Sequence, residues 1–114
     1  MSRTKINEAE TLLAIHLTEN EIDFEREVQL DPKRKWRWDF LVGCGRSPFA
    51  VEVQGGIWRK KGAHNTGVAI TRDCQKMRAA IMADYTPVNF TVQEVLTGTA
   101  IKWFLQYFEK ERTR

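Results

Sequence analysis

The sequence is short of cysteine and has no long apolar run, and each shortage excludes a class of protein. Its 114 residues include two cysteines, Cys44 and Cys74, which match neither a CxxC motif nor a paired disulfide spacing. We therefore expect free thiols in a reducing compartment. No apolar segment is long enough to cross a bilayer, and the N-terminus lacks the charged-then-apolar pattern of a secretory signal. The expected protein is soluble, cytoplasmic and without a membrane partner.

Internal repeats, low-complexity tracts and linkers rich in Pro, Gly or Ser are also missing, which favours one domain over residues 1–114. Hydrophobic residues make up 42% of the chain, enough for one packed core without disulfides or a metal. The formal net charge is +3. That mild excess permits a nucleic-acid partner but does not identify one.

Apolar residues change their period along the chain, from helical spacing to alternation and back. Helices are expected over residues 5–19, 69–84 and 92–111, and strands over residues 24–30, 36–42, 48–54 and 85–91. Thr91 and Glu94 have the spacing of a capping box at the start of the last helix. Residues 55–67 are expected to form a glycine-punctuated loop.

The resulting order is α-β-β-β-α-β-α, an α/β fold with a mixed sheet of about four strands flanked by helices. Three strands with short connections predict an antiparallel meander. A helical crossover joins the third strand to the fourth, so these two are expected to be parallel neighbours.

Polar residues share one phase of these strands. Asp39, Glu52 and Gln54 each alternate with apolar neighbours, and Glu27 is expected roughly opposite Asp39. Facing like charges destabilise a sheet unless something compensates them. A divalent cation with oxygen ligands would do so, whereas the alternative is an ordinary solvated polar face.

The order of these residues resembles the PD-(D/E)XK nuclease superfamily, in particular its small phage- and prophage-associated endonucleases. Four stretches carry the resemblance: residues 36–40 (Trp-Arg-Trp-Asp-Phe), 50–56 (Ala-Val-Glu-Val-Gln-Gly-Gly), 62–67 (Gly-Ala-His-Asn-Thr-Gly) and 73–76 (Asp-Cys-Gln-Lys). It extends from about the first helix to the fourth strand. The fold that it implies is restriction-endonuclease-like, and the activity is cleavage of DNA.

The resemblance also implies roles for individual residues. Asp39 and Glu52 would bind Mg²⁺, or Mn²⁺ as a substitute, with the Val53 carbonyl as a further ligand. The family's usual lysine, two residues after the second acid, is Gln54 here. Lys76 is a candidate for the missing charge, since it shares a helical face with Arg72; the alternative is a surface lysine.

Three further residues are candidates for the site. Glu8 in the first helix is a candidate for the additional acid that some family members carry, and Glu10 is an alternative to it. An ordinary solvent-facing glutamate is the third option. His64 follows the metal motif and is a candidate for contacting a phosphate or shuttling a proton.

Cations and aromatics near these acids are candidates for binding DNA. The candidates are Arg34, Lys35, Arg37, Trp58, Arg59, Lys60, Lys61 and Arg72. Arg37 shares a strand phase with Asp39, so pairing with a carboxylate is its alternative role. Trp36 and Trp38 are expected in the core, on the same side as Phe40.

These observations predict a magnesium-dependent DNA endonuclease that acts on branched or structured DNA by nicking or junction resolution. A homodimer is a natural way for such an enzyme to cut both strands. One alternative is a catalytically degenerate DNA-binding module with the nuclease fold. Another is a protein-interaction factor of a phage or mobile element, which would use the aromatic C-terminal helix at an interface.

Overall fold

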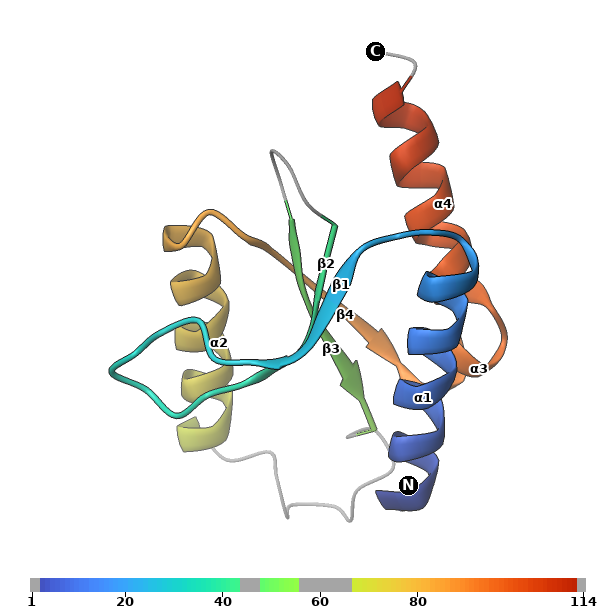
Figure 1. The fold of residues 1–114 in the computed structure, drawn as a ribbon. Helices are drawn as coiled ribbons and strands as arrows, with labels where there is room; N and C mark the ends of the chain where they lie inside the picture. Colours follow the sequence, from blue (N-terminus) through green and yellow to red (C-terminus); the bar gives the residue numbers. More distant parts are fainter. Residues whose placement is uncertain (1–2, 44–47, 56–66, 113–114) are drawn as a thin grey trace.

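The computed structural model describes residues 3–43, 48–55 and 67–112, which form a mixed four-stranded sheet with helices on both faces (Figure 1). The elements are α1 (Arg3–Glu19), β1 (Phe24–Val28), β2 (Trp38–Val42), β3 (Phe49–Gln54), α2 (Gly67–Met82), β4 (Thr86–Thr91), α3 (Val92–Leu96) and α4 (Thr99–Arg112). The predicted α/β class is confirmed. Within the described part of the chain, no helix combines the length and apolar character of a membrane span.

The sheet has the order β1-β2-β3-β4. β1, β2 and β3 are antiparallel neighbours, whereas β3 and β4 run parallel because α2 crosses over between them. Both the predicted meander and the predicted parallel pair are confirmed. The expected strands are longer than the observed ones, since β1 ends at Val28 and β2 begins only at Trp38.

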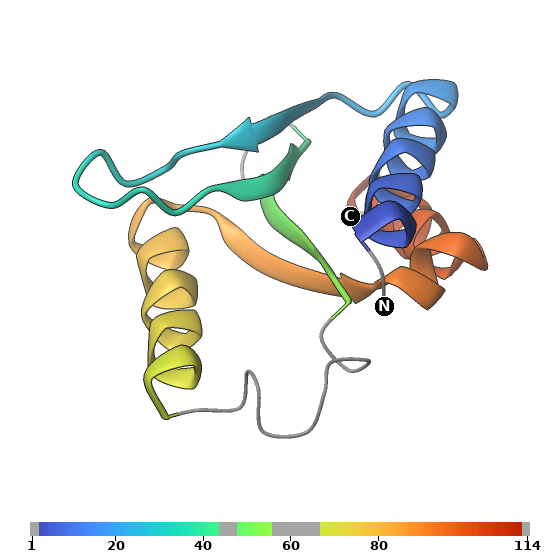
Figure 2. The same cartoon turned by 90° about the horizontal axis from the view of Figure 1, so that it is seen from below.

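One face of the sheet packs against α1, α3 and α4, and Figure 2 shows these helices together on that side. Leu13, Phe40 and Phe104 are fully buried there. Four rings of α4 surround the Phe49 ring, with centroid separations of 4.8–6.4 Å. The aromatic residues of the C-terminal helix therefore pack on the core of their own chain. An interface role for that helix stays a prediction.

The predicted single helix over 92–111 is wrong, because the chain forms two helices there. Thr91 caps α3 with the expected capping box to Glu94. The helix ends at Leu96, and Gly98 then adopts a left-handed φ of 83°, which interrupts the helical path before α4. The break turns α4 so that its aromatic side covers the sheet.

The other face of the sheet carries a smaller cluster. Trp38, Leu41 and Ala50 are buried there against Ala80 of α2. The expectation that Trp38 lies on the side of Phe40 is wrong: Glu27, opposite this point of β2, has a φ of 55°, and the regular pleat is interrupted. Trp36 precedes β2 and is only half buried, so it is not a core residue.

Candidate metal and nucleic-acid site

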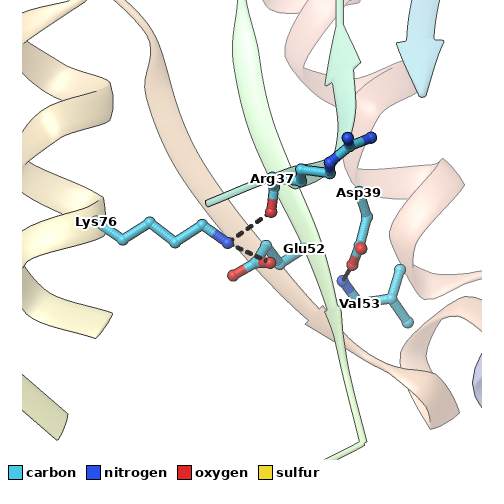
Figure 3. Close-up of polar contacts among 5 residues, drawn as sticks. All are labelled: Arg37, Asp39, Glu52, Val53 and Lys76. Carbon is cyan, nitrogen blue, oxygen red and sulfur yellow. Dashed lines mark hydrogen bonds and ion pairs between the residues drawn. The ribbon is translucent and has the colours of Figure 1, made fainter. Parts of the chain in front are cut away.

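The site is located where β2 and β3 cease to pair. Their register runs only as far as Phe40 and Val51. Beyond that point the N–H of Val53 donates to Asp39 Oδ2 at 2.8 Å (Figure 3). Strand geometry therefore holds the Asp39 carboxylate across the gap, next to the residue that follows Glu52.

Lys76 of α2 completes the arrangement from the other side. Its Nζ lies 2.7 Å from Glu52 Oε2 and 2.7 Å from the Arg37 carbonyl oxygen, to which it also donates. The same ammonium lies 4.7 Å from the centre of the Trp38 ring. The Lys76 side chain is only 12% exposed and that of Glu52 23%. The surface-lysine alternative is therefore wrong, while a catalytic role for Lys76 stays a prediction.

The two carboxylates are turned in different directions. In Figure 3, that of Glu52 points toward Lys76, and that of Asp39 points toward the Val53 N–H. Burial raises the pKa of both groups, and the charge of Asp39 raises that of Glu52 further. Hydrogen bonds from Val53 and Lys76 act in the opposite direction. The pair is thus short of compensating positive charge.

Of the two α1 glutamates considered, Glu10 is the one on which the charge of Asp39 acts. Burial raises the Glu10 pKa, and the charges of Asp39 and Glu27 add to that effect. Glu10 also pairs with Arg26 at 3.4 Å. Glu8, by contrast, is 53% exposed and pairs with Lys5. A role at a metal site for either helix glutamate stays a prediction.

Glu27 occupies the position that the alternation predicts for it. The register pairs Arg26 with Phe40 and Val28 with Trp38, which places Glu27 opposite Asp39. Its charge raises the pKa of Asp39. Gln54 ends β3 beside Thr91 of β4 and is half buried, and within the described residues its amide forms no hydrogen bond. The acidic patch therefore includes Glu27. Gln54 forms no hydrogen bond with the acids of the patch.

The residues predicted to contact DNA or a phosphate fall into three groups. Arg34 and Arg72 line one groove together with Trp36 and the first half of α2, and the Arg34 guanidinium lies 5.0 Å from the centre of the Trp36 ring. Lys35 and Arg37 are exposed on the β1–β2 connection. The remaining candidates lie outside the described residues: Trp58, Arg59, Lys60, Lys61 and His64.

Arg37 does not pair with a carboxylate in the described part of the chain. Figure 3 shows its guanidinium directed away from Lys76 and Glu52, while its carbonyl accepts the Lys76 hydrogen bond. The predicted carboxylate partner is therefore wrong.

Two carboxylates, those of Asp39 and Glu52, are the side chains of the site that could bind a hard cation such as Mg²⁺. Across residues 3–43, 48–55 and 67–112, no three His, Cys, Asp or Glu side chains gather as a metal-holding group. Mg²⁺ keeps several waters and is commonly held by one or two carboxylates, so Asp39 and Glu52 are sufficient in kind. Because Lys76 already holds Glu52 Oε2, a cation would compete with the ammonium for that oxygen.

Sequence reasoning missed two members of the site. Alternation places Arg26 in the apolar phase of its strand, yet its guanidinium pairs with Glu10 and lies 5.2 Å from the centre of the Phe40 ring. The same pattern predicts only a core role for Trp38, although its ring also lies against the Lys76 ammonium. A cation in an otherwise apolar strand phase was the available signal for Arg26.

Comparison with known proteins returned no match: no family model, curated protein or solved structure matches this chain. Its function is therefore inferred from the residues of the site.

Proposed function

We propose that this chain is a metal-dependent DNA endonuclease with a restriction-endonuclease-like fold. The observation that carries the proposal is the convergence of Asp39, Glu52 and Lys76 at the opening between β2 and β3. Half-burying two acids beside a single ammonium lowers the stability of the fold, and burial raises the pKa of both acids. Stability alone therefore gives no reason for this arrangement. Perturbed groups of this kind are typical of functional sites.

Each residue of the site has a separate role in the proposed reaction. Asp39 and Glu52 would hold Mg²⁺ or Mn²⁺, with the Val53 carbonyl as a further candidate ligand. When bound, such an ion stabilises charge on a phosphate and lowers the pKa of water. Lys76, fixed beside Glu52, supplies a second positive charge for the phosphate oxygens, as the lysine that Gln54 replaces would do.

Residues around the site suit a nucleic-acid strand. Arg34 and Arg72 line one groove and would provide charge for neighbouring phosphates, and the half-buried Trp36 lines the same groove. We extend the proposal to branched or structured DNA, cut by nicking or junction resolution. This extension depends on the resemblance to small phage-type endonucleases.

Cleavage of supercoiled plasmid and of a synthetic four-way junction tests the proposal, with Mg²⁺, Mn²⁺ or EDTA. Wild type is compared with Asp39→Ala, Glu52→Ala, Lys76→Ala and Gln54→Ala. We expect metal-dependent cutting that is lost in the first three variants and retained in part in the fourth. Glu8→Ala is the matched control, since Glu8 is an exposed helix glutamate that pairs with Lys5. Equal cutting by wild type and Asp39→Ala would reject the site.

A second candidate is a binding-only module, and the Lys76–Glu52 ion pair favours it because the lysine occupies a metal ligand. It predicts no cutting of either substrate. Junction binding, measured by mobility shift, would persist in EDTA and would weaken in an Arg34→Ala, Arg72→Ala double variant. Metal-dependent cutting by wild type excludes this candidate.

A further inference from the structure

The outer side of α2 is unexpectedly apolar. Ile70, Met77 and Ile81 are 54%, 42% and 58% exposed, and Cys74 is exposed between them. We call these four residues the α2 stripe. Figures 1 and 2 show α2 at one side of the molecule, where only the β1–β2 connection among the described segments extends past it. None of the four stripe residues belongs to a hydrophobic cluster of the described residues.

The spacing of the stripe is that of a two-helix contact. Its members follow one another at intervals of four, three and four residues, which is the a/d repeat of a coiled coil. The side of α2 that meets the sheet is different: Lys76 reaches Glu52 there, and Ala80 is buried. One side of α2 thus contacts the sheet, and a different side carries the α2 stripe.

Charges beside the stripe indicate what covers it. In the heptad notation abcdefg, Cys74 and Ile81 occupy a positions and Met77 a d position. Asp73 is then the g residue of one heptad, and Arg78 is the e residue of the following heptad. In a parallel pair of helices, a g residue faces the e residue five positions later in its partner. Asp73 and Arg78 are five positions apart, opposite in charge and exposed. In the described part of the chain, neither is in an ion pair.

From this self-complementarity we infer that α2 is a dimer interface between two copies of the chain, packed parallel about a two-fold axis. The two stripes bury one another, and two Asp73–Arg78 pairs flank them by symmetry. An antiparallel pair would instead place like flanks together, Asp73 beside Asp73 and Arg78 beside Arg78. The charges thus favour the parallel arrangement.

The interface is small, which sets the expected affinity. Standard protein interfaces bury about 800 Å² on each partner. Four side chains on one helix fall short of that area. We expect a reversible dimer with a micromolar dissociation constant, populated at high protein concentration. This expectation does not depend on nuclease activity.

Sedimentation velocity of the full chain, from low-micromolar to submillimolar concentration, tests the interface. Met77→Glu buries a charge against the partner and should raise the Kd about tenfold or more. Met82→Glu is the matched control, since Met82 is 84% exposed on the same helix but lies off the stripe, and its Kd should not change. A wild-type chain that stays monomeric throughout the range overturns the proposal.

Charge reversal tests the parallel register separately from folding. Asp73→Arg and Arg78→Asp should each raise the Kd, by about two- to fivefold for exposed ion pairs. The double variant restores opposite charges and should return to the wild-type value. A double variant that dimerises no better than the single ones contradicts the predicted pairing.

Oxidative cross-linking fixes the orientation. In a parallel dimer Cys74 faces the Cys74 of the second copy, whereas an antiparallel dimer would place it opposite Met77. In a Cys44→Ser background, mild oxidation should therefore give a disulfide-linked dimer that dithiothreitol reverses. Cys74→Ser in the same background should give none. Equal cross-linking with Met77→Glu, or no cross-link at concentrations where the dimer forms, overturns the parallel interface.

Discussion

The two faces of the sheet are built in different ways. Toward α1, α3 and α4 the core is continuous and apolar, with Phe40 and Phe104 fully buried and Phe49 enclosed by rings. Toward α2, four residues form a small buried cluster, and Lys76 of α2 is also joined to Glu52 of β3 by an ion pair. The first face holds most of the buried apolar area. The second holds the half-buried charge.

This contrast separates stability from chemistry. Apolar burial contributes to folding in proportion to area, so α1, α3 and α4 supply most of the stabilisation. A half-buried acid pair costs stability, and a well-packed opposite face makes that cost tolerable. Three changes test this division, beginning with the largest expected effect.

Phe104→Ala should produce the largest loss of stability. Phe104 is fully buried between α4 and the sheet. Removing a buried ring typically costs about 3–5 kcal/mol of unfolding free energy through lost burial and a residual cavity. Met82→Ala on α2, where the side chain is 84% exposed, should cost less than about 0.5 kcal/mol. Urea unfolding measures both, and similar losses would show that the two faces do not differ.

Lys76→Met should separate metal binding from cleavage. It keeps an apolar side chain near Trp38 but removes the ammonium from Glu52. If the proposed function holds, cleavage falls about 100-fold or more, because a charge aimed at the phosphate is lost. The affinity for Mg²⁺, measured by calorimetry, should instead rise because Glu52 is freed. Lys102→Met, on the exposed side of α4, is the control and should alter neither quantity.

The smallest effect is a change in the pH dependence of stability without metal. Burial raises the Asp39 pKa in the folded protein. The stabilising contribution of Asp39 is therefore complete below its unfolded pKa of about 3.9 and is lost as pH rises through the raised value. In Asp39→Asn the new amide does not titrate, yet its oxygen can still accept the Val53 hydrogen bond. Relative to wild type, this variant should thus gain stability from about pH 4 toward neutrality.

Urea unfolding at several pH values with EDTA measures that difference. Glu10→Gln should change the profile in the same direction, since burial also raises the Glu10 pKa. Glu8→Gln, at an exposed position of the same helix, is the matched control. A wild-type advantage over Asp39→Asn that grows with pH would contradict the sign.

Much of the fold was predictable because local patterns report it. Alternation predicted the first three strands, and the helical crossover predicted that the fourth is the parallel neighbour of β3. The Thr91–Glu94 capping box is a local motif and was found as such. The break at Gly98 was not, since a glycine within helical periodicity is compatible with either a continuous helix or a left-handed turn.

The site was predictable in its sheet residues and much less in its helix residues. Asp39 and Glu52 lie on neighbouring strands of a meander, so their order and phase were enough to bring them close. Lys76 and Glu10 come from helices on opposite faces of the sheet. Their approach depends on how each helix is rotated on the sheet, which side-chain packing determines. Periodicity alone therefore left Glu8 and Glu10 equivalent.

The sequence by itself determined the α/β class, the strand neighbours and the phase that places Asp39 and Glu52 together, because these follow from local period and connection length. Tertiary structure alone decided that Lys76 meets Glu52, that Glu10 rather than Glu8 approaches the acids, and that Trp38 packs under α2. Among the described residues, it also leaves Ile70, Cys74, Met77 and Ile81 exposed. The rotation of each helix on the sheet and the irregular backbone at Glu27 depend on tertiary packing. The local sequence pattern does not report them.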